Sequence, residues 1–294
     1  MMQEFTLTLF AVSTSYNWYG EIMLGWWRTG VRLEEYMNWI IENDGFTNGD
    51  ILLPALKTLN KPYKIWNDEF WNTKEYESFP KNSIFHGSLG NASKIKKELN
   101  FLPGSLCDEI GFSYSYIYEN YKEFVLTDNI IFTTINKLME NKEILKTITK
   151  ETKKIFARPN SPLKEFSGRI LDSENLTPAH FDYGFYHSNM DLQIVLSEYK
   201  KIDKEYRYVC INKKIITACE YIANGRKGLI STLNEDSWKF AQKIADKNKQ
   251  KDFVYIIDIC ESEGKFYLVE MNPFSGADLY CCDAEKIINE IEKA

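Results

Sequence analysis

The chain has no long hydrophobic run. No stretch of its 294 residues approaches the ~20 consecutive apolar residues that are needed to span a bilayer. Its first residues also lack the basic n-region, the long apolar core and the small-residue cleavage site of a signal peptide. We therefore expect a cytoplasmic protein with no membrane partner.

The common metal-binding patterns are missing as well. The histidines His86, His180 and His187 form no HExxH or HxH pattern, so we expect them to be structural polar residues. The six cysteines show no CxxC spacing that would indicate a zinc site or thioredoxin chemistry. We expect reduced structural thiols at all six positions, which are Cys107, Cys210, Cys219, Cys260, Cys281 and Cys282.

Two nucleotide-binding motifs and an excess of positive charge are also absent. The chain contains no GxxxxGK(S/T) phosphate loop and no GxGxxG motif opening a strand–helix unit, which excludes two common nucleotide-binding folds. Its formal net charge is -6, whereas non-specific binding to duplex DNA depends on a basic face that releases counterions. We expect no non-specific nucleic-acid binding.

What is present is the composition of a folded globular protein. Apolar residues make up 44% and charged residues 27% of the chain, whose length exceeds the usual size of one small core. We expect a boundary near residue 125, which gives an N-terminal lobe at 1–125 and a second domain at 126–294. Aromatic residues crowd the first half of the chain and indicate a core or, alternatively, a stacking surface.

The N-terminal lobe shows alternating strand and helix patterns, which predict a mainly parallel sheet. Gly87-Ser88, ahead of one predicted helix, indicates either an N-cap or an anion site at the helix start. The predicted elements are strands at 5–12, 64–66 and 83–86, helices at 32–42, after Asn48 and at 92–99, and a long connection at 101–121.

The second domain is richer in strand patterns. Its last two strands form a hairpin that turns at Gly264. The predicted elements are helices at 131–142, at 235–247 and from Asp283, and strands at 154–157, 169–171, 193–196, 206–211, 214–221, 253–260 and 265–271.

That hairpin carries the strongest candidate site. Period two places Glu270 and Asn272 on one face, and the turn brings Asp258 opposite Glu270 or within one residue of it. Two carboxylates and an amide oxygen suit a hard cation such as Mg²⁺, which retains waters and is completed by substrate phosphates. The alternative is a surface hairpin whose polar residues face water.

Three segments together resemble the ATP-grasp superfamily, and the last hairpin is the strongest of them. Asp258 to Tyr280 (DICESEGKFYLVEMNPFSGADLY) is similar to its terminal metal-binding hairpin, Phe156 to Ile170 (FARPNSPLKEFSGRI) to its phosphate loop, and Glu205 to Tyr221 (EYRYVCINKKIITACEY) to its ribose-contact segment. The chain resembles a phage and bacterial clade with arginine, here Arg158, in place of the usual phosphate-binding lysine. This resemblance implies an α/β (α+β) ATP-grasp fold with an N-terminal α/β, or pre-ATP-grasp, lobe.

The resemblance also implies ATP and Mg²⁺ as cofactors, with cations around the phosphates. Arg158 would bind phosphate oxygens, and Lys164 would close over them from a loop that ends at Gly168. Arg207 would point at the γ-phosphate or at a phosphorylated carboxylate, and would act with Lys164 in catalysis. An ordinary exposed lysine is the alternative for Lys164. The implied metal ligands are Asp258, Glu270 and Asn272.

The nucleoside would lie beside an inter-lobe hinge near residues 196–204. Glu205 would accept hydrogen bonds from the ribose hydroxyls; a salt bridge with Arg207, on the same strand face, is the alternative reading of that pair. Backbone groups of the hinge would read the adenine edge, at Ser197, Glu198 and Tyr199.

Within this superfamily we expect an ATP-dependent ligase. A substrate carboxylate would attack the γ-phosphate, and an amine or thiol would then displace phosphate from the acyl-phosphate. The partners would be ATP, a small-molecule or peptide carboxylate, and an amine or thiol acceptor, with the N-terminal lobe supplying part of the acceptor site. A kinase-like phosphotransferase and a non-catalytic ATP-binding module are the alternatives.

Overall fold

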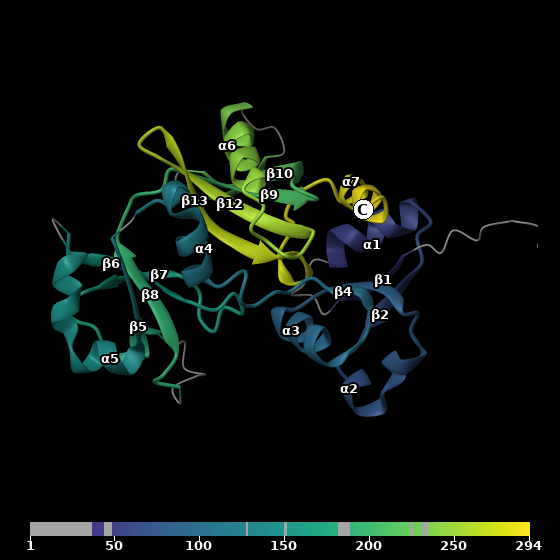
Figure 1. Cartoon of the computed structure of the whole chain (residues 1–294), viewed down its shortest axis with the longest axis horizontal. Helices are drawn as coiled ribbons and strands as arrows, with labels where there is room; N and C mark the ends of the chain where they lie inside the picture. Colours follow the sequence, from purple (N-terminus) through teal and green to yellow (C-terminus); the bar gives the residue numbers. More distant parts are fainter. Residues whose placement is uncertain are drawn as a thin grey trace, which may run out of the picture. The chain divides into compact units, whose positions relative to one another are not determined.

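The computed structural model of the chain describes residues 37–43, 49–127, 129–149, 152–181, 189–223, 226–230 and 235–294. All of the described residues belong to one compact unit, residues 35–294. The strand predicted at 5–12 lies outside the described residues. Within those residues, this unit contains three β-sheets (Figure 1).

The first sheet is parallel throughout, as the alternating pattern predicts. Its strand order is β2-β1-β3-β4, and the predicted strands at 64–66 and 83–86 are confirmed as β2 and β3. The elements of this part are β1 (Asn38–Glu42), α1 (Gly49–Thr58), β2 (Tyr63–Trp66), α2 (Phe70–Thr73), η1 (Glu75–Ser78), β3 (Asn82–His86), α3 (Leu89–Glu98) and β4 (Leu102–Ser105).

The helix predicted at 32–42 is wrong in its described part, because Asn38–Glu42 is strand β1. This central strand is buried on both faces: Trp39 and Ile41 pack in one hydrophobic core and Ile40 packs in another. A strand buried on both faces has a continuous apolar run rather than period-two alternation. The sequence therefore lacks the strand signal at this position.

The start of α3 is an N-cap, one of the two predicted possibilities. The Ser88 hydroxyl accepts a hydrogen bond from the Asn91 backbone N–H at 3.3 Å. The Ser88 N–H and hydroxyl both donate to Glu42 Oε2, at 2.8 and 2.9 Å. The helix start is therefore already bound by an internal carboxylate, which the positive end of the helix dipole favours.

The segment at 101–121, predicted as a long connection, contains β4 and the helix α4 (Tyr114–Tyr121). β4 is an edge strand, a position where Pro103 is tolerated. α4 is a short helix whose Ile117 and Tyr121 are buried against the third sheet. A helix of this length depends on tertiary packing, and the sequence alone gives little signal for it.

The second sheet is antiparallel, has the order β5-β8-β6-β7 and has its own hydrophobic core. The helix predicted at 131–142 begins later than expected, because the β-branched run before Ile135 forms an edge strand. The elements of this part are η2 (Lys122–Phe124), β5 (Ile130–Thr134), α5 (Ile135–Glu140), η3 (Lys142–Thr147), β6 (Lys154–Pro159), β7 (Arg169–Asp172), η4 (Pro178–Phe181) and β8 (Gln193–Glu198).

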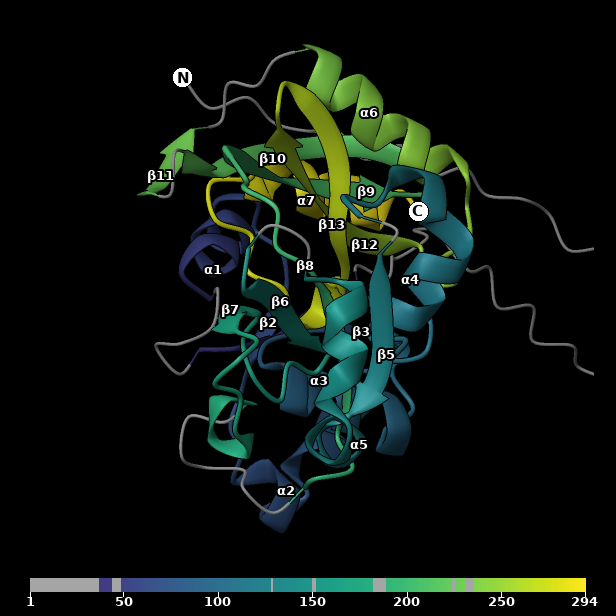
Figure 2. The ribbon, with the colours of Figure 1, turned by 90° about the vertical axis from the view of Figure 1, so that its left-hand side faces the viewer.

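The third sheet is antiparallel, with the order β11-β10-β9-β12-β13. Its central strands alternate as predicted: Val209 and Ile256 pack with α1 and α7, whereas Tyr208 and Ile257 pack with α4 and α6. Figure 2 shows α6 on the opposite side of this sheet from α7. The elements are β9 (Lys204–Ile211), β10 (Lys214–Ala223), β11 (Arg226–Ile230), α6 (Glu235–Asp246), β12 (Val254–Ser262), β13 (Lys265–Pro273), η5 (Phe274–Gly276) and α7 (Ala284–Glu292).

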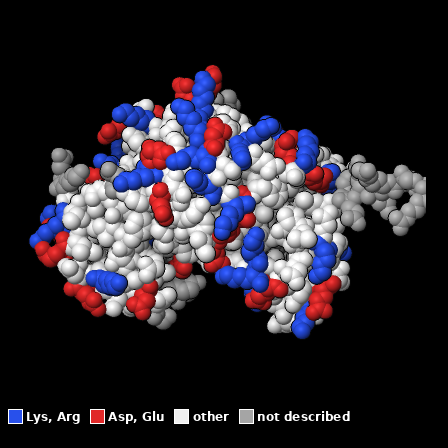
Figure 3. All heavy atoms as spheres, in the orientation of Figure 1, with Lys and Arg blue, Asp and Glu red and all other residues white. Residues whose placement is uncertain are grey.

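Positive and negative side chains are mixed on the face of the molecule that Figure 3 shows. Figure 3 shows Lys and Arg interspersed with Asp and Glu on the face in view, without a continuous basic area there. Among the helices that the structure describes, none has both the length and the apolar composition that crossing a membrane requires.

The expectation of six reduced thiols is wrong at two positions. Cys219 on β10 and Cys281 form a disulfide across a sequence separation of 62, with their Cα atoms 5.5 Å apart. The pairing depends on the fold, because the sequence shows no short spacing between these cysteines. Cys107, Cys210, Cys260 and Cys282 are free and buried, as expected.

The disulfide should stabilise the protein measurably. Closing a loop of this length restricts the unfolded chain, so reduction with dithiothreitol should lower the free energy of unfolding by about 2–4 kcal/mol. Urea unfolding with and without the reductant measures the difference. The Cys219→Ser/Cys281→Ser variant should match the reduced parent and should not respond to the reductant. Six titratable thiols in the denatured, unreduced parent would contradict the assignment.

Candidate active site

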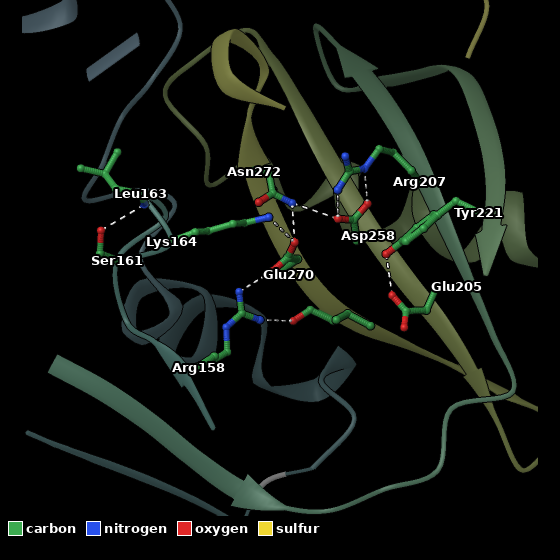
Figure 4. A network of polar contacts seen from close by, with 11 residues as sticks. Arg158, Ser161, Leu163, Lys164, Glu205, Arg207, Tyr221, Asp258, Glu270 and Asn272 are labelled. Carbon is green, nitrogen blue, oxygen red and sulfur yellow. Dashed lines mark hydrogen bonds and ion pairs between the residues drawn. The ribbon is translucent and has the colours of Figure 1, made fainter. Parts of the chain in front are cut away.

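The hairpin of β12 and β13 brings the three predicted metal ligands together. Asp258 pairs directly with Glu270 in the strand register, as predicted. The Asn272 amide donates hydrogen bonds to Asp258 Oδ2 and Glu270 Oε1, both at 2.9 Å. Asp258 and Asn272 are buried, so this is not a hairpin with polar residues facing water. Figure 4 shows the three side chains converging on one side of the hairpin.

A β-bulge shapes this end of the hairpin. Asp258 pairs with Glu270 and the next residue, Ile259, pairs with Leu268, so Val269 has no partner in the register. Its carbonyl accepts a hydrogen bond from Arg158 Nη1 at 3.1 Å. Bulges re-aim side chains and backbone groups and often occur beside active sites. The period-two pattern gives no signal for this bulge.

Arg207 forms a buried pair with Asp258. The two residues are register partners on the adjacent strands β9 and β12, and their contacts are Nε to Oδ1 at 2.8 Å and Nη2 to Oδ2 at 2.6 Å. Arg207 Nη1 also donates to the Asp278 carbonyl at 2.5 Å. Burial opposes the charged form of Arg207, but the Asp258 carboxylate holds the pKa of the guanidinium well above its usual value.

Glu270 lies between the other two predicted cations. Lys164 Nζ is 3.1 Å from Oε1, and the Arg158 guanidinium forms an ion pair with Oε2. Burial alone would raise the pKa of the Glu270 carboxyl, but Lys164, Arg158 and the Asn272 amide hold it well below its usual value. Burial raises the pKa of the neighbouring Asp258 carboxyl, although Arg207 opposes this shift. Lys164 is exposed, as one of the two alternatives had it, but its ammonium contacts Glu270 and so belongs to the charged cluster.

The sequence offered a salt bridge between Glu205 and Arg207 as one alternative, but the structure gives each of these residues a different hydrogen-bond partner. The Tyr221 hydroxyl donates to Glu205 Oε2 at 2.5 Å. Tyr221 stacks on Tyr280 with ring centroids 4.9 Å apart, and Arg207 lies 4.8 Å from the Tyr280 ring centroid. Burial raises the pKa of the Glu205 carboxyl. The two tyrosines thus join Glu205 to the charged cluster, a role that the sequence does not indicate.

A cavity of about 370 Å³ adjoins this cluster. The predicted hinge lines one part of it, and Arg158 and Glu205 line another part. Its other walls are largely apolar, and the partly exposed Ile170 belongs to them. Apolar residues on strands look like ordinary core positions in a sequence, so the prediction missed most of these walls. The lining includes Ser197, Glu198, Tyr199, Tyr114, Phe156, Ile170, Leu268 and Val269.

The two histidines in the described part of the chain, His86 and His180, have their partners outside this cluster. His86 is buried with its ring 5.0 Å from that of Phe274, and burial lowers its pKa to about 4. His180 Nδ1 accepts a hydrogen bond from the Thr177 N–H at 3.0 Å. Both are structural polar residues, as predicted, whereas His187 lies outside the described residues. Within the described ranges, no group of three or more His, Cys, Asp or Glu side chains is arranged to hold a metal.

Comparison with known proteins gives a family match. Residues 127–289 match the family described as ATP-grasp domain, R-2-K clade family 2. A comparison with curated protein sequences gives no significant match.

Solved structures of ATP-grasp ligases share the fold. D-cycloserine synthetase DcsG superposes with a TM-score of 0.60 at 11% identity, covering 87% of this chain and 99% of that one. D-alanine–D-alanine ligase from Bacillus anthracis gives 0.55 at 14% identity, with coverage of 85% and 90%. The ATP-grasp ligase PsnB in complex with its minimal precursor gives 0.57 at 9% identity, with coverage of 86% and 97%. These likenesses confirm the predicted fold class and show the fold alone.

The ion pairs of Glu270 should appear in the pH dependence of stability. Glu270→Gln leaves two cations without their anion, so the free energy of unfolding should fall by about 2 kcal/mol near neutral pH. Folding lowers the pKa of the Glu270 carboxyl below its ordinary value of 4.5. As the pH falls below 4.5, the unfolded chain therefore binds a proton at Glu270 while the folded chain does not. The free energies of unfolding of the parent and of Glu270→Gln should therefore become more similar as the pH falls below 4.5.

Urea unfolding of both proteins at about pH 7 and about pH 4 measures this difference. Glu263→Gln is a matched control, since it makes the same change at an exposed residue of the hairpin turn. A Glu270→Gln variant that is as stable as the control at every pH would show that the ion pairs contribute nothing.

Proposed function

We propose that this chain is an ATP- and Mg²⁺-dependent ligase that joins a carboxylate to an amine or thiol. The premise is that the chain belongs to the clade of the ATP-grasp domain family whose model it matches. One observation carries the proposal. A buried cluster of carboxylates and cations adjoins a cavity that the expected adenine hinge lines. This combination supplies both halves of a nucleotide site, a largely apolar pocket and a charged end.

The cavity is proposed to hold the nucleoside. Its apolar walls suit a purine, and the backbone at Ser197 to Tyr199 would supply the polar groups that read the base edge. Glu205 would bind the ribose hydroxyls, with its carboxylate oriented by the Tyr221 hydroxyl. Arg158 lines the same cavity and contacts Glu270, so the phosphates would run from the cavity towards the hairpin.

The hairpin residues fit a hard cation. Asp258 and Glu270 provide carboxylate oxygens, and rotation of the Asn272 amide would present its oxygen between them. This set is too small to enclose an ion, which agrees with Mg²⁺ sites that are completed by phosphates and waters. Bound Mg²⁺ would neutralise phosphate charge during transfer.

The cations are proposed to change partners when the nucleotide binds. Lys164 and Arg158 neutralise Glu270 in the structure, and both become available to phosphate oxygens once Glu270 has a cation as its partner. Lys164 lies on the loop between β6 and β7, where it would approach the γ-phosphate and shield it from water. Arg207 remains tied to Asp258 and would stabilise negative charge at this end of the site.

The proposed reaction has two steps. A substrate carboxylate attacks the γ-phosphorus of ATP, and the bond between this phosphorus and the bridging oxygen breaks, so that ADP leaves. An amine or thiol then attacks the acyl carbon, loses a proton and releases phosphate. The protein contributes position and charge rather than a covalent nucleophile, and Lys164, Arg158 and Arg207 would stabilise the transferring phosphoryl group together with Mg²⁺.

A substrate screen tests the reaction type. With Mg-ATP and pooled carboxylates, amines and thiols, we expect ADP and phosphate to be released in step with a condensed product detected by mass. Hydroxylamine should trap the acyl-phosphate as a hydroxamate. Lys164→Ala should slow hydroxamate formation on the order of a hundredfold, because the developing phosphoryl charge loses a cation.

The control for this variant is Lys265→Ala, an exposed lysine at the start of β13. It should form hydroxamate at the parent rate. A stable phosphorylated product without free phosphate would overturn the ligase proposal in favour of a kinase-like phosphotransferase. Binding of ATP without turnover over a broad panel would favour a binding module instead.

A further inference from the structure

We propose that Tyr114 is a positioning residue that holds the Arg158 guanidinium towards the nucleotide phosphates, and that Asn160 fixes Tyr114 in place. This inference rests on the proposed function, because it takes Arg158 to be a phosphate ligand. Tyr114 is the first residue of α4, far from Arg158 in sequence, and the motifs of the sequence do not indicate it.

The ring of Tyr114 supports one face of the guanidinium. Arg158 Cζ lies 4.7 Å from the Tyr114 ring centroid, and both residues line the cavity. Burial raises the pKa of the Tyr114 phenol, so the ring is neutral at ordinary pH. A planar guanidinium stacks well on an aromatic face, whereas a lysine ammonium offers no such plane.

The other contacts of Arg158 explain why the ring matters. Nη1 donates to the Val269 carbonyl and Nη2 to Glu270, while Nε is buried without a hydrogen-bond acceptor among the described residues. If Glu270 turns to a cation when the nucleotide binds, Arg158 loses its anion. The Tyr114 ring and the Val269 carbonyl then remain to fix its direction.

The start of α4 is bound to the strand that carries Arg158. The first backbone N–H groups of a helix have no acceptor within that helix. Asn160 supplies two acceptors: its carbonyl binds the Tyr114 N–H and its side-chain Oδ1 binds the Ser115 N–H, both at 2.8 Å. Asn160 follows Arg158 by two residues, and its own N–H donates to the Gln193 carbonyl on β8 at 2.9 Å. Asn160 thereby fixes the position of the Tyr114 ring relative to the Arg158 guanidinium.

A double-mutant cycle tests the proposal, with the dissociation constant for Mg-ATP measured by calorimetry. Tyr114→Leu should weaken binding about tenfold, and Tyr114→Phe, which retains the ring, should restore it to within about twofold of the parent. In an Arg158→Ala background, Tyr114→Leu should have no further effect, because it acts through the guanidinium. Tyr118→Leu is the matched control, because Tyr118 lies one turn further along α4 and its ring contacts Phe132 of β5; this variant should leave binding unchanged.

A second pair of variants covers the case in which Tyr114→Leu does not fold. Asn160→Ala should weaken Mg-ATP binding in the same direction, whereas Asn160→Asp, which keeps the acceptor oxygen, should bind more tightly than Asn160→Ala. Here too the effect should vanish in the Arg158→Ala background.

The outcomes separate this inference from the proposed function. If the parent does not bind Mg-ATP, the proposed function fails. If the parent binds and Arg158→Ala weakens binding, equal binding by Tyr114→Leu would overturn the positioning role. The same holds if Tyr114→Leu weakens binding equally with and without Arg158, which would mean that the ring contacts the nucleotide directly.

Discussion

Buried carboxylates need cationic partners, and this constraint governs how the site is assembled. Asp258 is fully buried and the Glu270 side chain is 15% exposed, so the ionised form of each carboxylate depends on a nearby positive charge. The partners come from different parts of the chain: Arg207 from the adjacent strand β9, and Arg158 and Lys164 from the second sheet and its loop. The ion pairs therefore join the second and third sheets at the point where the phosphates would lie.

Apolar packing connects the first sheet to the third sheet and to the loop that carries Lys164. Trp39 and Ile41 of β1 share a hydrophobic core with Val209 and Ile256 of the third sheet. Leu163, next to Lys164 in the loop between β6 and β7, packs against the aromatic core beside Trp66. The N-terminal lobe thus supports the loop that carries a proposed catalytic cation. We propose, in line with the expected boundary near residue 125, that this lobe also supplies part of the acceptor site.

How much the sequence could predict depends on how local each signal is. The pairing of Asp258 with Glu270 follows from period two and a Gly264 turn, and a short hairpin is a local structure. The bulge at Val269, the Cys219–Cys281 disulfide and the contact of Tyr114 with Arg158 depend on segments that meet only in the folded chain. The sequence could not predict strand β1 for another reason: a strand that is buried on both faces lacks the alternation of apolar and polar residues that marks a strand.

The central claim is that the charged cluster beside the cavity is a Mg-ATP site, and calorimetric titration tests it most directly. We expect saturable binding of one Mg-ATP per chain, much weaker binding of ATP with a chelator, and a loss of affinity of at least about tenfold in Glu270→Gln but not in Glu263→Gln. Absence of Mg-ATP binding by the parent, or equal binding by the two variants, would show that the charged cluster is not a Mg-ATP site.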